Sequence, residues 1–202
     1  MDLRRELKEL YSAGREPVLI YVPELAFFMI DGHGDPNTSA EYAQAIEALY
    51  SVAYTVKFTV KRAPGGVDFG VMPLEGLWWT PDMTTFSSDD KSSWEWTVMI
   101  TQPDVVTPEI FEAARIAAGV RKPAAPIGRV RLERFAEGLA AQVMHLGTYP
   151  AEGPTIERLH TFIAAQDYER AGKHHEIYLS DPRRTAPEKL KTIVRQPVRP
   201  AR

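Results

Sequence analysis

The sequence predicts an α+β fold made of two strand–helix–strand–strand units that pair around an approximate two-fold axis. Apolar runs of strand length alternate with two long amphipathic helical stretches. Residues 27–36 read as apolar strand, glycine, proline and helix cap, and residues 140–155 repeat that order, which indicates an internal duplication. Paired units of this kind predict a cleft between the two long helices and the sheet.

The first half-repeat is expected over residues 17–102, after a short amphipathic helix at 2–13. Tyr50, Tyr54 and Phe58 recur every four residues and form an aromatic row along one side of the long helix. The expected elements are an extended segment, the long helix, a strand interrupted by proline, a polar loop and a second strand, at 17–31, 38–63, 67–79, 80–91 and 93–101.

A connecting helix is expected over 107–119, with Thr107 as its cap and Pro108 in its first turn. The second half-repeat is expected over 128–182. Its elements are two strands, a helix and a last strand, at 130–135, 139–146, 155–171 and 174–179. The basic stretch 183–202 is expected to be a solvated C-terminal tail.

Composition limits the classes of partner. The 202 residues are 44 % hydrophobic and 25 % charged, with a net charge of −3, and no basic surface for nucleic acid is concentrated in the main body. The chain has no cysteine, no apolar leader and no run long enough to span a bilayer. We therefore expect a cytoplasmic protein that binds neither nucleic acid nor membrane. Its strand edges leave homodimer pairing open.

All four tryptophans lie between residues 78 and 96, on the two strands that follow the long helix. Alternation places Trp94 and Trp96 on one face, and it turns Trp78 and Trp79 to opposite faces. Aromatic walls stack on flat ligands and attract cations, although the same cluster also suits a core between two strands. Pro73 leaves open whether Trp78 or Trp79 faces a ligand.

One carboxylate stands out on the last strand. Parity places Glu176 and Tyr178 on one face and Ile177 and Leu179 on the other. A buried glutamate without a partner takes a proton or meets a cation, so it suits a cationic ligand or acts as a base. The alternative is an exposed strand glutamate, which is the commoner arrangement.

Other catalytic and cofactor patterns are missing from the sequence. The five histidines lack metal-ligand spacing, and no nucleophile elbow is present, so neither a metal nor a cofactor is expected. Gly32 and Gly34 form a turn, because no further glycine or lysine follows to hold a phosphate.

Four stretches resemble the GyrI-like small-molecule-binding family, in particular its stand-alone branch without a DNA-binding domain. They are Phe28–Pro36, Met72–Trp79, Trp94–Thr97 and His175–Arg184, and the last is the most specific. The resemblance spans about residues 17 to 198. It implies a single GyrI-like domain over residues 1–202, with the effector-binding fold of multidrug regulators and a central ligand cleft.

The resemblance also implies site residues. Regulators of this family sense cationic, aromatic drugs, and their cleft-floor glutamate corresponds to Glu176 here. The resulting set of expected ligand-binding residues is Tyr54, Phe58, Trp79, Trp96, Tyr149, Glu176 and Tyr178.

Two functions follow from this set. The first is binding of planar aromatic or cationic xenobiotics. The second is hydrolysis, because some stand-alone members open the cyclopropane ring of DNA-alkylating toxins. Glu176 would then be the general base, and Tyr178 or Tyr54 would donate a hydrogen bond to the carbonyl that gains charge. A protein-interaction module is a lesser alternative.

Overall fold

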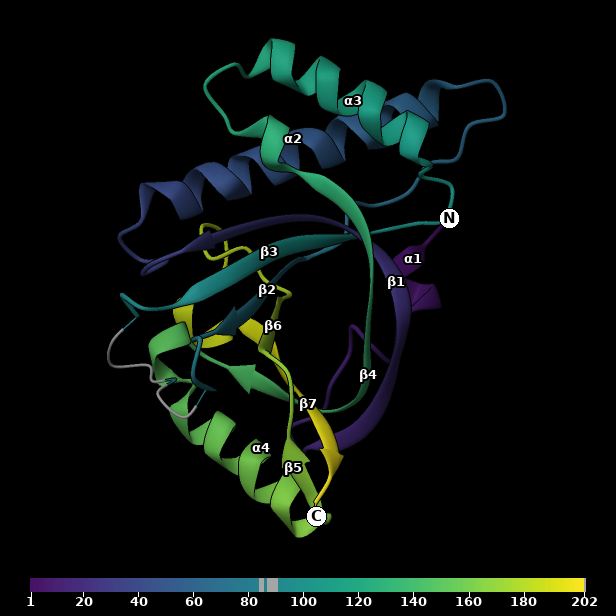
Figure 1. Cartoon of the computed structure of the whole chain (residues 1–202). Coiled ribbons are helices and arrows are strands. Elements are labelled where there is room, and N and C mark those ends of the chain that lie inside the picture. The colour runs from purple at the N-terminus through teal and green to yellow at the C-terminus, as the bar shows by residue number, and fades with distance from the viewer. Residues whose placement is uncertain (84–85, 87–90, 202) are drawn as a thin grey trace. The chain divides into compact units, whose positions relative to one another are not determined.

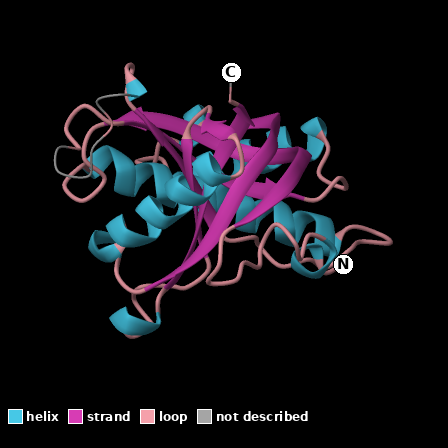
Figure 2. Cartoon of the chain, turned by 90° about the horizontal axis from the view of Figure 1, so that it is seen from below, coloured by secondary structure: helices cyan, strands magenta, loops and turns pink. Residues whose placement is uncertain are grey.

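The computed structural model describes residues 1–83, 86 and 91–201 and has an α+β fold, with helices and strands both well represented (Figures 1 and 2). The helices of this part are α1 (Leu3–Glu6), α2 (Ala40–Arg62), α3 (Pro108–Arg121) and α4 (Gly153–Ala165), with short 3₁₀ turns at Ile127–Arg129, Tyr149–Ala151 and Pro187–Lys189. Its strands are β1 (Val18–His33), β2 (Leu74–Trp79), β3 (Glu95–Gln102), β4 (Arg131–Leu146), β5 (Tyr168–Arg170), β6 (His174–Tyr178) and β7 (Lys191–Pro200).

The chain forms two compact units, and each takes residues from both halves of the sequence. Unit 1 comprises Met1–Glu6, Leu25–Met72 and Trp79–Phe135, and unit 2 comprises Leu7–Glu24, Pro73–Trp78 and the described part of Ala136–Arg202. This division differs from the predicted half-repeats 17–102 and 128–182, because most of β2 belongs to unit 2. Among the described residues, no helix is long and apolar enough to cross a membrane.

Unit 1 is built on an antiparallel pair of strands and two helices. β1 pairs with β3 in a register that runs from Ala26 opposite Gln102 to His33 opposite Glu95. The helix α2 is capped by Ser39, whose hydroxyl accepts from the Tyr42 amide, and its buried stripe is mostly alanine and valine. The helix α3 lies alongside α2 (Figure 1).

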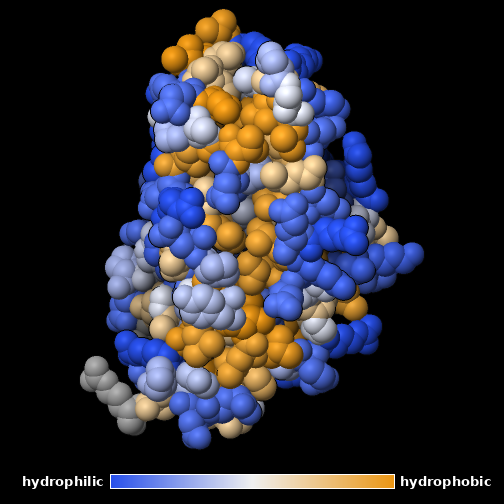
Figure 3. Space-filling view, turned by 90° about the vertical axis from the view of Figure 1, so that its right-hand side faces the viewer, coloured by the Kyte–Doolittle hydropathy of each residue, from blue (hydrophilic) through white to orange (hydrophobic). Residues whose placement is uncertain are grey.

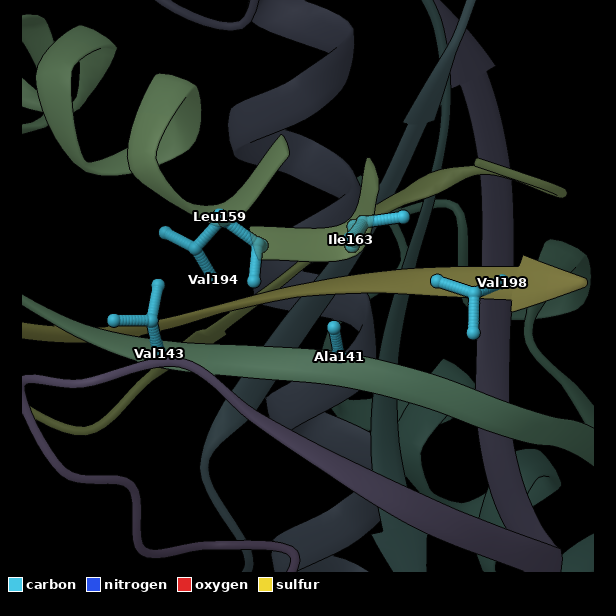
Figure 4. Close-up of a cluster of buried hydrophobic side chains, with 6 residues drawn as sticks. All are labelled: Ala141, Val143, Leu159, Ile163, Val194 and Val198. Carbon is cyan, nitrogen blue, oxygen red and sulfur yellow. The ribbon is translucent and has the colours of Figure 1, made fainter. Parts of the chain in front are cut away.

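Unit 2 has β6 in its middle, with β2 on one side and β7 on the other. The long β7 also pairs with β4 and β5. The helix α4 covers one face of these strands through a closed apolar cluster, shown in Figure 4. Its members come from β4, α4 and β7 and are Ala141, Val143, Leu159, Ile163, Val194 and Val198.

Several predicted boundaries are wrong. The helix expected at 2–13 covers only Leu3–Glu6, and the strand expected at 67–79 begins at Leu74, directly after Pro73. Gly119 does not end α3, which continues to Arg121. Half of the predicted loop 80–91, residues 84–85 and 87–90, lies outside the described residues.

The second half also differs from its prediction. The two strands expected at 130–135 and 139–146 are one strand, β4. The helix expected to reach residue 171 ends at Ala165, because Asp167 takes a left-handed conformation with φ of 60° and β5 follows.

The largest correction concerns the expected tail at 183–202. Residues 191–200 form β7, whose Ile193 and Val194 have no exposed surface. The basic residues of this stretch suggested a solvated segment. Its β-branched Thr192, Ile193 and Val194 instead suit a strand, and they are paired on both sides, with β4 and β6.

Candidate functional site

Glu176 lies at the centre of β6. The strands β2 and β7 pair with β6 on either side and shield Glu176 from solvent. It is 9 % exposed, so the alternative of a solvent-exposed glutamate is wrong. Strand alternation turns His174, Glu176 and Tyr178 to one face. The pairing partner of Glu176 on β7 is Val194, which belongs to the cluster under α4, so this face is the one that α4 covers.

Among the described residues, three side chains contact the Glu176 carboxylate. The hydroxyl of Tyr178 donates to Oε2 over 2.7 Å, and Nε2 of His174 lies 3.1 Å from Oε1. Glu152, which is 4 % exposed, also forms a hydrogen bond to Glu176.

These contacts decide the charge of the site. Burial raises the pKa of Glu176, but the hydrogen bond and the charge of His174 lower it by more, and Tyr178 and Glu152 lower it further. The resulting pKa is below the ordinary value of 4.5. Glu176 is therefore a buried carboxylate that stays ionised at neutral pH.

The rim of this site is aromatic and polar. The rings of Tyr149 and Tyr178 meet edge to face with centroids 5.5 Å apart, and Tyr149 is 37 % exposed. Glu152 directly precedes α4, whose N-terminal end carries partial positive charge. Thr192 on β7 is paired with Tyr178, and its buried Oγ1 has no hydrogen-bond partner among the described residues.

The register also identifies which tryptophan is near Glu176. Gly76 on β2 is paired with Glu176, and Trp78 is paired with His174. A Cβ atom at Gly76 would lie 2.7 Å from the indole Nε1 of Trp78, so the indole folds back over Gly76. Trp78 therefore shares the face of the Glu176 carboxylate and Trp79 is turned to the opposite face of β2, an alternative that the sequence left open.

A second polar cluster occupies the opposite face of the same strands. The His175 ring lies between two carboxylates, with Nδ1 3.0 Å from Glu137 and Nε2 3.0 Å from Glu75. The Arg195 guanidinium adds a contact of 3.2 Å to Glu137, and the Tyr11 hydroxyl donates to Glu75 over 2.6 Å. The Glu137 side chain is 2 % exposed and the other four residues are buried, so the charges of this cluster compensate one another and are not accessible to a ligand.

The pKa shifts of His175 and Glu137 indicate that the His175 cluster is a network of paired charges. Burial lowers the pKa of His175, but the Glu137 charge and the hydrogen bonds from Glu137 and Glu75 outweigh it and raise the pKa to about 9. Burial raises the pKa of Glu137, and His175 and Arg195 together bring it below its ordinary value. Arg195 also donates to the Leu10 carbonyl, which fastens the N-terminal segment of unit 2.

The other predicted site residues belong to unit 1. Tyr54 and Phe58 line a groove between α2 and α3. None of the described lining residues belongs to a strand, whereas the sequence predicted a cleft between the long helices and the sheet. Trp96 has no exposed surface, because its ring lies over Gly32 and meets the Tyr42 ring at 85°. This position gives Trp96 a packing role.

Sequence reasoning placed Tyr178 on the face of Glu176 but missed His174, Glu152 and the ion network. His174 could have been found, because it shares the parity of Glu176 and Tyr178. Glu152 carries no such signal, since its contact with Glu176 depends on the position of α4. Among the described residues, no group of three or more His, Cys, Asp or Glu is arranged to hold a metal ion.

Comparisons with known proteins place this chain in a family. The sequence profile of the GyrI-like small molecule binding domain matches residues 15–199. The crystal structure of an uncharacterized conserved protein from Listeria innocua is 42 % identical with a TM-score of 0.92, over 98 % of this chain and 100 % of its own. A hydrolase from Listeria innocua is 40 % identical with a TM-score of 0.86, again over 98 % and 100 %.

A more distant similarity concerns the fold alone. The C-terminal domain of EcmrR is 11 % identical with a TM-score of 0.56, over 92 % of this chain and 98 % of its own. A comparison with curated protein sequences finds no match.

Proposed function

The chain belongs to the GyrI-like small-molecule-binding domain family, and we propose that it binds a planar aromatic or cationic xenobiotic in the cytoplasm, with Glu176 as the counter-charge. The observation that carries this proposal is a buried, ionised carboxylate whose described partners are an imidazole, a phenol and a second carboxyl group. The imidazole of His174 is a cation only when it is protonated, so beside a neutral His174 a cationic ligand would complete the charge balance.

The rings around the carboxylate support the same ligand class. Tyr149 and Tyr178 provide aromatic surface near Glu176, and the buried indole of Trp78 lies over Gly76, the pairing partner of Glu176. Aromatic faces attract cations and stack on flat rings. The role of Trp79 as a ligand contact stays a prediction.

Calorimetric titration with the cationic dye rhodamine 6G tests the proposal. The Glu176→Gln variant keeps the side-chain shape and removes the charge, and we expect it to weaken binding by about tenfold or more, which corresponds to at least about 1.4 kcal/mol. Glu188→Gln, at an exposed glutamate, is the matched control and should bind as the wild type does. An absence of binding by the wild type, or equal binding by Glu176→Gln, contradicts the proposal.

Hydrolysis is the second candidate. It is favoured by the similarity to a hydrolase from Listeria innocua and by the contact of 3.1 Å between His174 and Glu176. The lowered pKa makes Glu176 a weak base, so we assign the proton to His174, with the carboxylate stabilising the imidazolium. This differs from the base predicted from the sequence.

The proposed step adds one water to a cyclopropane-bearing alkylator. The water oxygen bonds to the ring methylene carbon, and the broken C–C bond delivers its electron pair to the conjugated carbonyl, which becomes a phenolate. The proton lost by water passes to His174 and then to the phenolate. The Tyr178 hydroxyl has one proton, which it donates to Glu176, so it would stabilise the phenolate oxygen by turning that hydrogen bond from Glu176 to the substrate.

Mass spectrometry of the alkylator after incubation separates hydrolysis from binding. A mass gain of one water with the wild type, strongly reduced in His174→Gln, supports hydrolysis. Recovery of the intact compound, combined with saturable binding of rhodamine 6G, leaves binding as the function and rejects turnover.

A further inference from the structure

A groove in unit 1 has a lining that includes none of the residues that contact Glu176. It runs between the C-terminal half of α2 and the end of α3, and its volume is about 770 Å³. This size is in the range of small-molecule sites. Its lining residues come from the two helices and the positions directly after them, and those that matter for its chemistry are Tyr54, Thr55, Phe58, Arg62, Ala117 and Arg121.

One wall of the groove is aromatic. Tyr54 stacks on Tyr50 with centroids 6.2 Å apart and on Phe58 at 6.5 Å, with interplanar angles of 28° and 25°. Tyr54 is 48 % and Phe58 is 42 % exposed, so this row is not part of the core of unit 1. Figure 3, which colours each residue by its hydropathy, shows hydrophobic residues at the surface at the top of its view. Flat exposed rings in a row suit a planar aromatic ligand.

The charge of the groove is positive. Of its described lining residues, Arg62, Arg121 and Lys122 are cationic and none is Asp or Glu. Lys122 forms an ion pair with Glu47 over 2.9 Å, whereas Arg62 lies over the Phe58 ring, with its Cζ 5.5 Å from the centroid. The carbonyl ends of α2 and α3 contribute about half a negative charge each, which leaves the groove positive.

Arg121 is held in place for recognition of an anion. Its Nη2 donates to Thr55 Oγ1, and that hydroxyl in turn donates to the Ser51 carbonyl. A guanidinium has five N–H donors, so this bond fixes its plane and leaves others for a carboxylate. Arginine binds a planar carboxylate through two parallel hydrogen bonds, which a lysine cannot do.

From these observations we propose that the α2–α3 groove is a second ligand site, selective for planar aromatic carboxylates. The aromatic ring lies against Tyr54 and Phe58, and the carboxylate is held by Arg121. The charge of this ligand is opposite to that of the ligand proposed for Glu176, so the two sites differ in selectivity and can be tested independently.

The test is a titration of the whole protein with 2-naphthoate, followed by amide chemical shifts, with 2-naphthamide as the neutral analogue of the same shape. We expect saturable binding of 2-naphthoate, with shifts in the C-terminal half of α2 and the end of α3. Binding of 2-naphthamide should be about tenfold weaker or more, since it loses the charge-assisted pair with Arg121. Equal affinity for the two compounds, or no saturable shift, overturns the proposal.

Two variants locate the site. Arg121→Gln should weaken 2-naphthoate about tenfold and leave 2-naphthamide unchanged. Ala117→Trp fills the groove from an exposed helical position and should abolish binding of both compounds, whereas Val120→Trp, at a position of α3 that is 79 % exposed and outside the lining, should not. Unchanged 2-naphthoate binding by Ala117→Trp overturns the proposal.

A cross-check separates this proposal from the function proposed for Glu176. Glu176→Gln should bind 2-naphthoate as the wild type does, and Ala117→Trp should bind rhodamine 6G as the wild type does. Loss of 2-naphthoate binding in Glu176→Gln would assign both compounds to one site and would overturn the second site, whatever the result for rhodamine 6G.

Discussion

The neighbouring residues His174 and His175 serve different clusters, because a strand turns successive side chains to opposite faces. His174 contacts the ionised Glu176 below α4, where a ligand would complete the charge balance. His175 contacts Glu75 and Glu137, and Arg195 completes that cluster. The first cluster is a candidate site, and the second is a closed structural network.

The His175 network predicts a loss of stability in alkali. The folded-state pKa of His175, about 9, is above the value near 6.5 in the unfolded chain, so its contribution is complete below about pH 6.5 and disappears as pH rises through about 9. Urea unfolding should show a decrease of about 2–3 kcal/mol between about pH 7 and pH 10 from this group.

The control for that measurement is His175→Gln, which should be less stable at pH 7 by about 3–5 kcal/mol, because two buried carboxylates lose their shared cation. The difference in stability between the variant and the wild type should shrink toward pH 10. A difference that does not change with pH would contradict the raised pKa of His175.

Tyr178→Phe is predicted to change the pH range of ligand binding. The Tyr178 hydrogen bond helps to hold the pKa of Glu176 below 4.5, so wild-type affinity for rhodamine 6G should be lost only as pH falls through that lowered value. Without this hydrogen bond, the affinity for rhodamine 6G should begin to fall at a higher pH. Titrations between about pH 3 and pH 7 measure this, with Tyr21→Phe, at a tyrosine that is 71 % exposed, as control.

At the scale of elements, β7 determines whether unit 2 can form. It pairs with β4, β5 and β6, and it supplies Val194 to the cluster under α4 and Arg195 to the His175 network. A chain ending at Leu190 should therefore lose the near-ultraviolet circular dichroism of the native protein. A chain ending at Pro200, which keeps the whole strand, should retain it. Native spectra from the shorter chain would contradict this role.

At the scale of the whole molecule, the chain path couples the two units. β1, β2 and β4 each begin in one unit and end in the other. A strand of that kind cannot unravel in one unit without disturbing its continuation, so we expect one cooperative unfolding transition. Native-state hydrogen exchange should give β3 in unit 1 and β6 in unit 2 opening free energies equal within about 1 kcal/mol. Two distinct free energies would contradict the coupling.

Local patterns were enough to predict the α+β class, the family and the parity of β6. Apolar periodicity, helix caps and turn residues act over a few positions, so they identify α2, α3 and the face shared by Glu176 and Tyr178. The tertiary structure decided the role of β7, the choice of Trp78 beside Glu176 and the position of Tyr54 and Phe58 against α3. Those outcomes depend on which strands pair and which helix face is covered, and such long-range contacts leave no periodic signal in the residues that make them.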